Sequence, residues 1–134
     1  MKKLVLDNLE IDGKPYTVRL DVTEDDFGPT VYDLMFVNTG QLLNEPFLFF
    51  KTGDYSLEPD EIKLTDIFSS ISEDKGIGSL LLNYLFDFAK NEGYSKIIGS
   101  MHSTSETSLE KLEHFYKKNG FVIDGNTITK NIKE

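Results

Sequence analysis

The sequence predicts a single α/β domain: a mixed central sheet with an antiparallel N-terminal half, a strand-helix-strand unit, and a C-terminal helix followed by a hairpin. In the first half of the 134-residue chain, apolar residues recur at every second position, which is the period of a β-strand. In the second half they recur at the helical period. This length accommodates one hydrophobic core and is too short for two ordinary domains. We therefore expect one domain over residues 1–134, with N-terminal strands in 1–58 and the other elements in 60–132.

The first half is predicted to consist of antiparallel strands. Leu4 and Leu6, and then the apolar residues of 16–22, recur at every second position, and Asp12-Gly13 between them has the composition of a hairpin turn. Apolar runs at 31–37 and 47–50 predict two more strands. The segment between these two runs is either an irregular connection or a short helix.

The next predicted strand carries an acidic residue in an apolar pattern. Ile62 and Leu64 alternate and are followed by Ile67-Phe68, a pattern typical of a strand that becomes buried on both faces. Continued alternation places Asp66 on the face of Ile62 and Leu64. A carboxylate that is partly buried there has a raised pKa and could act as a general base toward an ammonium group. The alternative is a β-bulge that turns Asp66 outward.

A helix and a short strand complete a crossover unit. The apolar stripe that follows Gly76-Ile77-Gly78 predicts a largely buried helix, which ends at Glu92-Gly93 because glycine can adopt the left-handed C-terminal cap. The strand 96–98 comes directly after it. A strand-helix-strand connection of this kind normally makes the two strands parallel.

The C-terminal segment predicts a second helix and a final hairpin. Thr107 and Glu110 have the spacing of a capping box, and Gly120 is expected to end the helix that they open. Strands at 121–123 and 127–129 then enclose residues with turn chemistry.

The loop before the first helix has the composition of an anion site. Gly76 and Gly78 would let the backbone close on an anion, and the first amides of a helix lack intrahelical partners. The helix dipole adds partial positive charge, and Lys75 could add an ionic contact. This geometry suits a pyrophosphate, although a glycine pair before a helix can also be only a tight turn.

Two stretches, in this order and separation, carry a family resemblance. The first is Lys75–Leu82, a glycine loop that leads into a helix, and the second is Phe115–Phe121, in which Tyr116 precedes Gly120 by four residues. Together they resemble the pyrophosphate loop and the later helix end of the GNAT superfamily of acetyl-coenzyme A-dependent N-acyltransferases. The resemblance covers about residues 60–132, the expected cofactor-binding half.

The resemblance implies a fold, a cofactor and roles for individual residues. The cofactor is acetyl-coenzyme A, held where the strand ending near Ser70 and the strand near Ile97 splay apart. Tyr116 is implied as the general acid that protonates the departing thiolate, and a phenol suits that role because its ordinary pKa is about 10. The strand amides implied to face the thioester are those of Ser69, Ser70 and Ile71. The amides implied to bind the phosphates are those of Gly76, Ile77, Gly78 and Ser79.

The implied function is direct transfer of an acetyl group to a primary amine. Asp66, or a water that it holds, would take the proton of the acceptor, which is a small cationic amine or a protein lysine or N-terminus. The chain departs from the family pattern at Glu73 and Leu109. A catalytically degenerate module that binds coenzyme A or a partner protein without turnover is therefore an alternative, and a plain α/β interaction domain is a third.

Composition narrows the choice of partners. With 14 basic and 23 acidic residues the net charge is −9, which disfavours nucleic acid and suits a cationic acceptor. The absence of cysteine excludes disulfides and an acyl-cysteine mechanism. His102 and His114 have no ligand pattern, so we expect no metal site. Without a signal peptide or membrane span, we expect a cytoplasmic protein without a membrane partner. Homodimerisation is one way in which the acceptor site could be completed.

Overall fold

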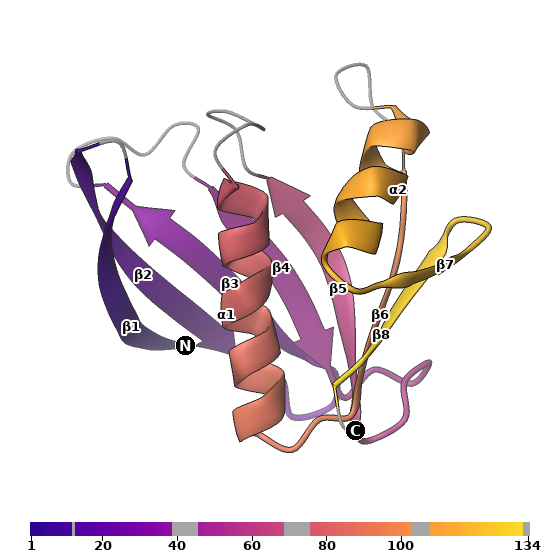
Figure 1. Cartoon of the computed structure of the whole chain (residues 1–134). Helices are drawn as coiled ribbons and strands as arrows, with labels where there is room; N and C mark the ends of the chain where they lie inside the picture. Colours follow the sequence, from indigo (N-terminus) through magenta and orange to yellow (C-terminus); the bar gives the residue numbers. More distant parts are fainter. Residues whose placement is uncertain (12, 39–45, 69–75, 103–107, 133–134) are drawn as a thin grey trace.

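The computed structural model describes residues 1–11, 13–38, 46–68, 76–102 and 108–132. Within them the chain forms one mixed sheet of eight strands and two helices (Figure 1). The strands are β1 (Lys2–Ile11), β2 (Lys14–Thr23), β3 (Thr30–Val37), β4 (Phe47–Thr52), β5 (Glu61–Phe68), β6 (Lys96–Ser100), β7 (Val122–Asp124) and β8 (Thr127–Asn131). The helices are α1 (Ile77–Asn91) and α2 (Leu109–Lys118).

The topology of the sheet follows from the connections between its strands. The order is β1-β2-β3-β4-β5-β6-β8-β7, in which β1 to β5 pair antiparallel with their neighbours in sequence. The crossover through α1 makes β5 and β6 parallel, and β8 pairs antiparallel with both β6 and β7. The predicted antiparallel N-terminal half, parallel crossover and final hairpin are therefore confirmed. The segment 39–45, where a short helix was considered, lies outside the described residues.

One face of the sheet carries the hydrophobic core. Alternate residues of β2 to β6 and β8 are buried there, from Val18 and Leu20 in β2 to Ile128 in β8. Helix α1 packs on this inner face through Leu81, Leu82 and Leu85, which are fully buried. Each such leucine contributes about 2 kcal/mol of transfer free energy.

Both helices cover the same face. The Phe86 ring of α1 packs on Phe121, whose ring in turn packs on Tyr116 of α2. Figure 1 shows α1 and α2 in front of the sheet. The opposite, outer face is covered by neither of the two helices in the described part of the chain, and side chains on it such as Asp33, Met35 and Phe49 are half-buried.

Caps at the helix ends agree with the sequence except at one position. Gly93 and Gly120 adopt positive φ angles of 82° and 90° directly after α1 and α2, as predicted. The capping box was wrong, because α2 begins at Leu109 with Ser108 as its N-cap, and the Ser108 hydroxyl accepts a hydrogen bond from the Lys111 amide at 3.2 Å. The helix therefore starts one residue later than expected, and Thr107 lies outside the described residues.

Candidate active site

Helix α1 begins at the glycine pair that was predicted to bind an anion. Gly76 is the N-cap with a φ of 70°, a left-handed conformation that glycine adopts without steric cost. The Leu80 amide donates to the Gly76 carbonyl at 3.0 Å, which closes the first helical turn. None of the described residues caps the preceding amides 77–79 with a side chain, and this first turn contains no acidic residue. The N-terminal end of α1 can therefore offer amide hydrogens and partial positive charge to phosphate oxygens.

The pairing of β5 with β6 ends part-way along β5, one residue before the end of β6. They pair from Glu61 with Lys96 to Leu64 with Gly99, and the described register shows the rest of β5 paired with β4 alone. At the last pair, a Cβ on Gly99 would lie 3.0 Å from the Leu64 carbonyl oxygen and 3.3 Å from Ile128 Cγ1. Glycine thus permits the close contact from which the strands diverge. This separation agrees with the opening that the resemblance implied.

A β-bulge in β5 determines where Asp66 lies. The neighbouring residues Phe49 and Phe50 of β4 pair with Asp66 and Leu64, which leaves Thr65 as an extra residue. The bulge shifts the alternation by one position, so that Asp66 is exposed on the face opposite to Leu64. The prediction of a partly buried carboxylate on the Leu64 face is therefore wrong, and the bulge considered as its alternative is present. Burial on both faces was expected at Ile67-Phe68; Ile67 packs against the core, and the side chain of Phe68 lies outside the described residues.

The residue after the bulge fixes the orientation of this carboxylate. Ile67 packs against the core, and its backbone amide donates a hydrogen bond to Asp66 Oδ1 at 2.9 Å. The acid is thereby held close to the backbone of β5, on the segment that has separated from β6.

Tyr116 lies in the core at the C-terminal end of α2. Its side chain is 5% exposed, and its ring makes edge contacts with Phe115 and Phe121 at centroid distances of 5.1 and 5.3 Å. Burial raises the pKa of the Tyr116 phenol to about 12, with a smaller contribution from the negative charge of Asp66. The structure therefore brings the two predicted catalytic residues within electrostatic reach of each other, although their side chains were expected to interact with different reactants.

Asn119 connects the predicted acid to the predicted phosphate site. Its side-chain amide donates to Ser79 Oγ at 3.2 Å and to the Phe115 carbonyl at 2.8 Å. This links the first turn of α1 with the C-terminal end of α2, which carries Tyr116. Sequence reasoning missed this role and that of Gly99, because the partners are 40 and 35 residues away and only the tertiary fold brings them together.

The other predicted residues are placed only in part. Ser69, Ser70, Ile71 and Lys75 lie outside the described residues, as does Glu73. Leu109 is the first residue of α2 and 40% exposed, and His102 and His114 are exposed. In the described residues no helix has the length and apolar composition needed to cross a membrane.

A comparison with known protein families matches the part of the chain that contains the candidate site. The sequence profile of the acetyltransferase (GNAT) family matches residues 67–121, which contain α1, β6, α2 and both stretches that carried the resemblance. A sequence search among curated proteins found no match. The resemblance to the GNAT superfamily is therefore supported by the family profile within about the second half of the chain, and the solved structures extend the comparison to the sheet.

Three solved structures illustrate the structural similarity. An acetyltransferase of the GNAT family from Staphylococcus aureus Mu50 is 16% identical, with a TM-score of 0.58 over 77% of this chain and 68% of that one. The ribosomal-protein-S18-alanine N-acetyltransferase from Escherichia coli is 15% identical, with a TM-score of 0.60 over 76% and 69%. The PaiA N-acetyltransferase from Thermoplasma acidophilum, solved in complex with coenzyme A, is 21% identical, with a TM-score of 0.56 over 75% and 60%.

This chain has the GNAT fold. The predicted fold class and the predicted resemblance are thereby confirmed. In this GNAT fold the outer face of β2 to β5 lies opposite the two described helices (Figure 1), and the Asn119 to Ser79 hydrogen bond joins the C-terminal end of α2 to the first turn of α1.

Proposed function

We propose that the chain transfers the acetyl group of acetyl-coenzyme A directly to a primary amine. The observation that carries this proposal is the connection of three features at one place. The uncapped N-terminal end of α1 lies beside the end of α2 through the Asn119 to Ser79 hydrogen bond, and Tyr116 of α2 is within electrostatic reach of Asp66 on the separated segment of β5. An acetyl transfer needs all three features: the N-terminal end of α1 for the phosphates of the cofactor, Tyr116 for the leaving thiolate, and Asp66 for the acceptor amine.

The described residues fit the cofactor at its phosphate end. The left-handed Gly76 and the amides 77–79 can hold the pyrophosphate, and Asn119 fixes Ser79 beside them. Acetyl-coenzyme A, when bound, would supply a thioester whose carbon–sulfur bond breaks as the carbon–nitrogen bond to the acceptor forms. The parting of β5 from β6 after Leu64 and Gly99 leaves strand backbone available to orient that group.

The reaction requires two proton transfers, one from the acceptor ammonium to Asp66 and one from Tyr116 to the departing sulfur. An exposed carboxylate held to β5 by the Ile67 amide can receive the acceptor ammonium and take its proton, directly or through a water. Tyr116 is protonated at neutral pH because its pKa is raised to about 12, so it can donate its O–H toward the departing sulfur.

The two steps are coupled through charge. The negative charge of Asp66 contributes to the raised pKa of Tyr116. When Asp66 is neutralised, by pairing with the ammonium or by taking its proton, this contribution disappears and Tyr116 becomes a better acid. Proton uptake at the acceptor would therefore favour proton release at the leaving group.

Isothermal titration with acetyl-coenzyme A, followed by a thiol-release assay on a panel of amines, tests the proposal. We expect binding of the cofactor and amine-dependent release of thiol, with release diminished in Tyr116→Phe. Binding without thiol release from any amine would favour the module without turnover. No binding up to millimolar concentration would overturn the acyltransferase proposal and favour an interaction domain.

A further inference from the structure

The outer face of the sheet carries a row of side chains that leads away from Asp66. The strand register places Asp21 of β2 opposite Asp33 of β3, Asp33 opposite Phe49 of β4, and Phe49 opposite Asp66 of β5. Residues that are directly opposite in neighbouring strands point to the same face. Since one strand separates Asp33 from Asp66, their backbones are about 10 Å apart, which is two strand spacings.

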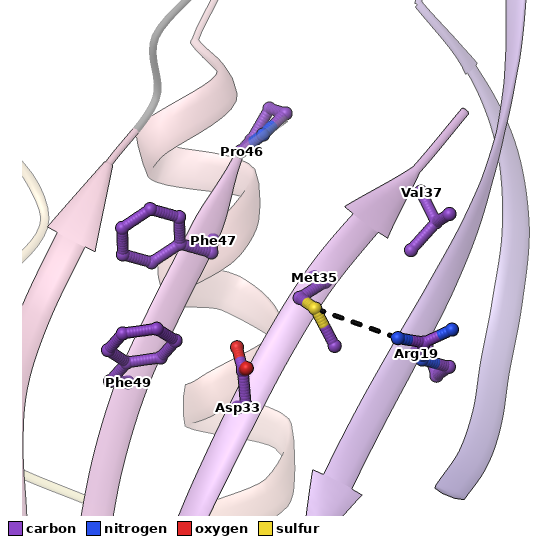
Figure 2. A pocket seen from close by; sticks show the side chains of 7 residues that line it. All are labelled: Arg19, Asp33, Met35, Val37, Pro46, Phe47 and Phe49. Carbon is purple, nitrogen blue, oxygen red and sulfur yellow. Dashed lines mark hydrogen bonds between the residues drawn. The ribbon is translucent and has the colours of Figure 1, made fainter. Parts of the chain in front are cut away.

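Two adjoining hollows lie along this row. Their volumes are about 180 and 300 Å³, and both are lined by Asp33 and Phe49. Figure 2 shows the first of them on the side of the strands away from α1, with Asp33 between Met35 and Phe49. The stacked rings of Phe47 and Phe49, 4.5 Å between centroids, form one wall.

Asp33 has an unsatisfied oxygen in this hollow. Its Oδ1 atom is buried and makes no hydrogen bond within the described part of the chain. Burial, and then the charge of Asp21, raise the pKa of Asp33 to about 6, even though Arg19 acts in the opposite direction. A buried acceptor without a partner costs free energy, and a cationic group in the hollow would offset part of that cost through its charge.

The cation already present in the hollow is engaged elsewhere. Arg19 Nε lies 3.0 Å from Asp21 Oδ1, and Arg19 Nη2 donates to Asp21 Oδ2 at 3.3 Å and to the Met35 sulfur at 3.8 Å. Arg19 and Asp21 therefore balance each other's charge, and Asp33 is left as the net negative charge. Aromatic faces and a thioether beside a carboxylate suit an alkylammonium group, because cations bind favourably over aromatic rings.

We propose that the hollow at Asp33 binds the second cationic group of a dicationic aliphatic amine, whose first amine lies at Asp66 for acetylation. The alkyl chain of this acceptor would cross β4 over Phe49. The inference rests on the proposed function for the reaction at Asp66, but the subsite itself is a binding property and can be measured without turnover. It names the acceptor by chemistry: two ammonium groups on an aliphatic chain long enough to span two strand spacings.

Titration of the full chain with three probes tests this subsite. The probes are heptane-1,7-diamine, whose nitrogens reach about 10 Å apart as two strand spacings require, heptylamine as a single cation, and ethylenediamine as a diamine too short to span the row. We expect the long diamine to bind at least tenfold more tightly than the other two. In Asp33→Asn this preference should disappear, because the variant keeps the shape of the side chain and removes its charge.

A matched variant and a stability measurement separate this effect from general charge or misfolding. Asp87→Asn removes the same charge from an exposed position on α1, and we expect it to keep the preference for the long diamine. Urea unfolding of Asp33→Asn should show a folded protein at least as stable as the wild type. Equal binding of the long diamine and heptylamine to the wild type, or a preserved preference in Asp33→Asn, would overturn the subsite.

Failure of the subsite can be told apart from failure of the proposed function. Coenzyme A binding depends on the N-terminal end of α1, and it should be unchanged in Asp33→Asn. If coenzyme A binds and supports acetylation of heptylamine as well as of the long diamine, the function stands and the subsite is refuted. If coenzyme A does not bind while the diamine preference is present, the subsite stands and the acyltransfer proposal is refuted.

Discussion

Replacing Gly76 with alanine tests the anion site at the start of α1. Gly76 has a φ of 70°, and a Cβ at this position would meet no atom of the described residues within 4 Å, so the substitution introduces backbone strain without a clash against them. Holding a non-glycine residue in the left-handed region costs about 1–2 kcal/mol. The free variant is expected to relax its helix cap, and ligand binding then has to restore the strained conformation. Coenzyme A should accordingly bind about five- to thirty-fold more weakly.

Gly93 provides the matched control at the other end of the same helix. Its φ is 82°, and a Cβ there would also lie more than 4 Å from the atoms of the described part of the chain. Gly93→Ala should therefore impose a similar strain, visible in urea unfolding, while coenzyme A affinity remains that of the wild type. Isothermal titration of both variants decides the matter. Unchanged affinity in Gly76→Ala, or an equal loss of affinity in both variants, would refute the assignment of the phosphate site.

Three further predictions concern the acid, the strand separation and the outer face. Tyr116→Phe should lower kcat about 10²- to 10⁴-fold without changing coenzyme A affinity. The pKa of the Tyr116 phenol is raised to about 12, so its protonated form is lost only near that pH. Wild-type kcat should therefore show no decrease caused by this phenol between about pH 7 and 10. Gly99→Ala should lower the free energy of unfolding by about 1–3 kcal/mol in urea denaturation, since its Cβ would lie 3.0 Å from the Leu64 carbonyl oxygen; an unchanged midpoint would contradict the close contact. Asp33 has a folded-state pKa of about 6 against an ordinary value of 3.8, so its contribution to stability is full below about pH 4 and decreases as pH rises through 6. Asp33→Asn should then raise the free energy of unfolding at pH 7 by about 1 kcal/mol, a value discounted for the partial exposure of the side chain, and the gain should vanish near pH 4.

The expected gain at Asp33 fits a functional role for this residue. A carboxylate that destabilises the fold at neutral pH, with an oxygen that lacks a partner in the described residues, is a local cost of the kind found at binding sites. Loss of diamine preference in Asp33→Asn together with a gain in stability could not be explained by unfolding.

The sequence by itself determined the order and type of the elements. Its two hydrophobic periods, the glycines at helix ends and the turn residues are local signals, and a strand-helix-strand connection is almost always made with one handedness. The antiparallel N-terminal strands and the parallel β5–β6 pair could therefore be predicted, and so could the glycine turn before α1. The placement of Tyr116 near the C-terminal end of α2 could also be predicted, because the sequence pattern that ends at Gly120 is local.

Only the tertiary structure decided which side chains meet. The bulge at Thr65 cannot be read from alternation, because an extra residue in β5 is defined by its pairing with β4, and it reversed the face of Asp66. The contact of Asn119 with Ser79, the close approach of Gly99 to Leu64 and the row from Asp21 to Asp66 depend on register between distant segments. The sequence specifies which side chains are present. The distances between them in a site depend on long-range packing and strand pairing, which no local sequence pattern contains.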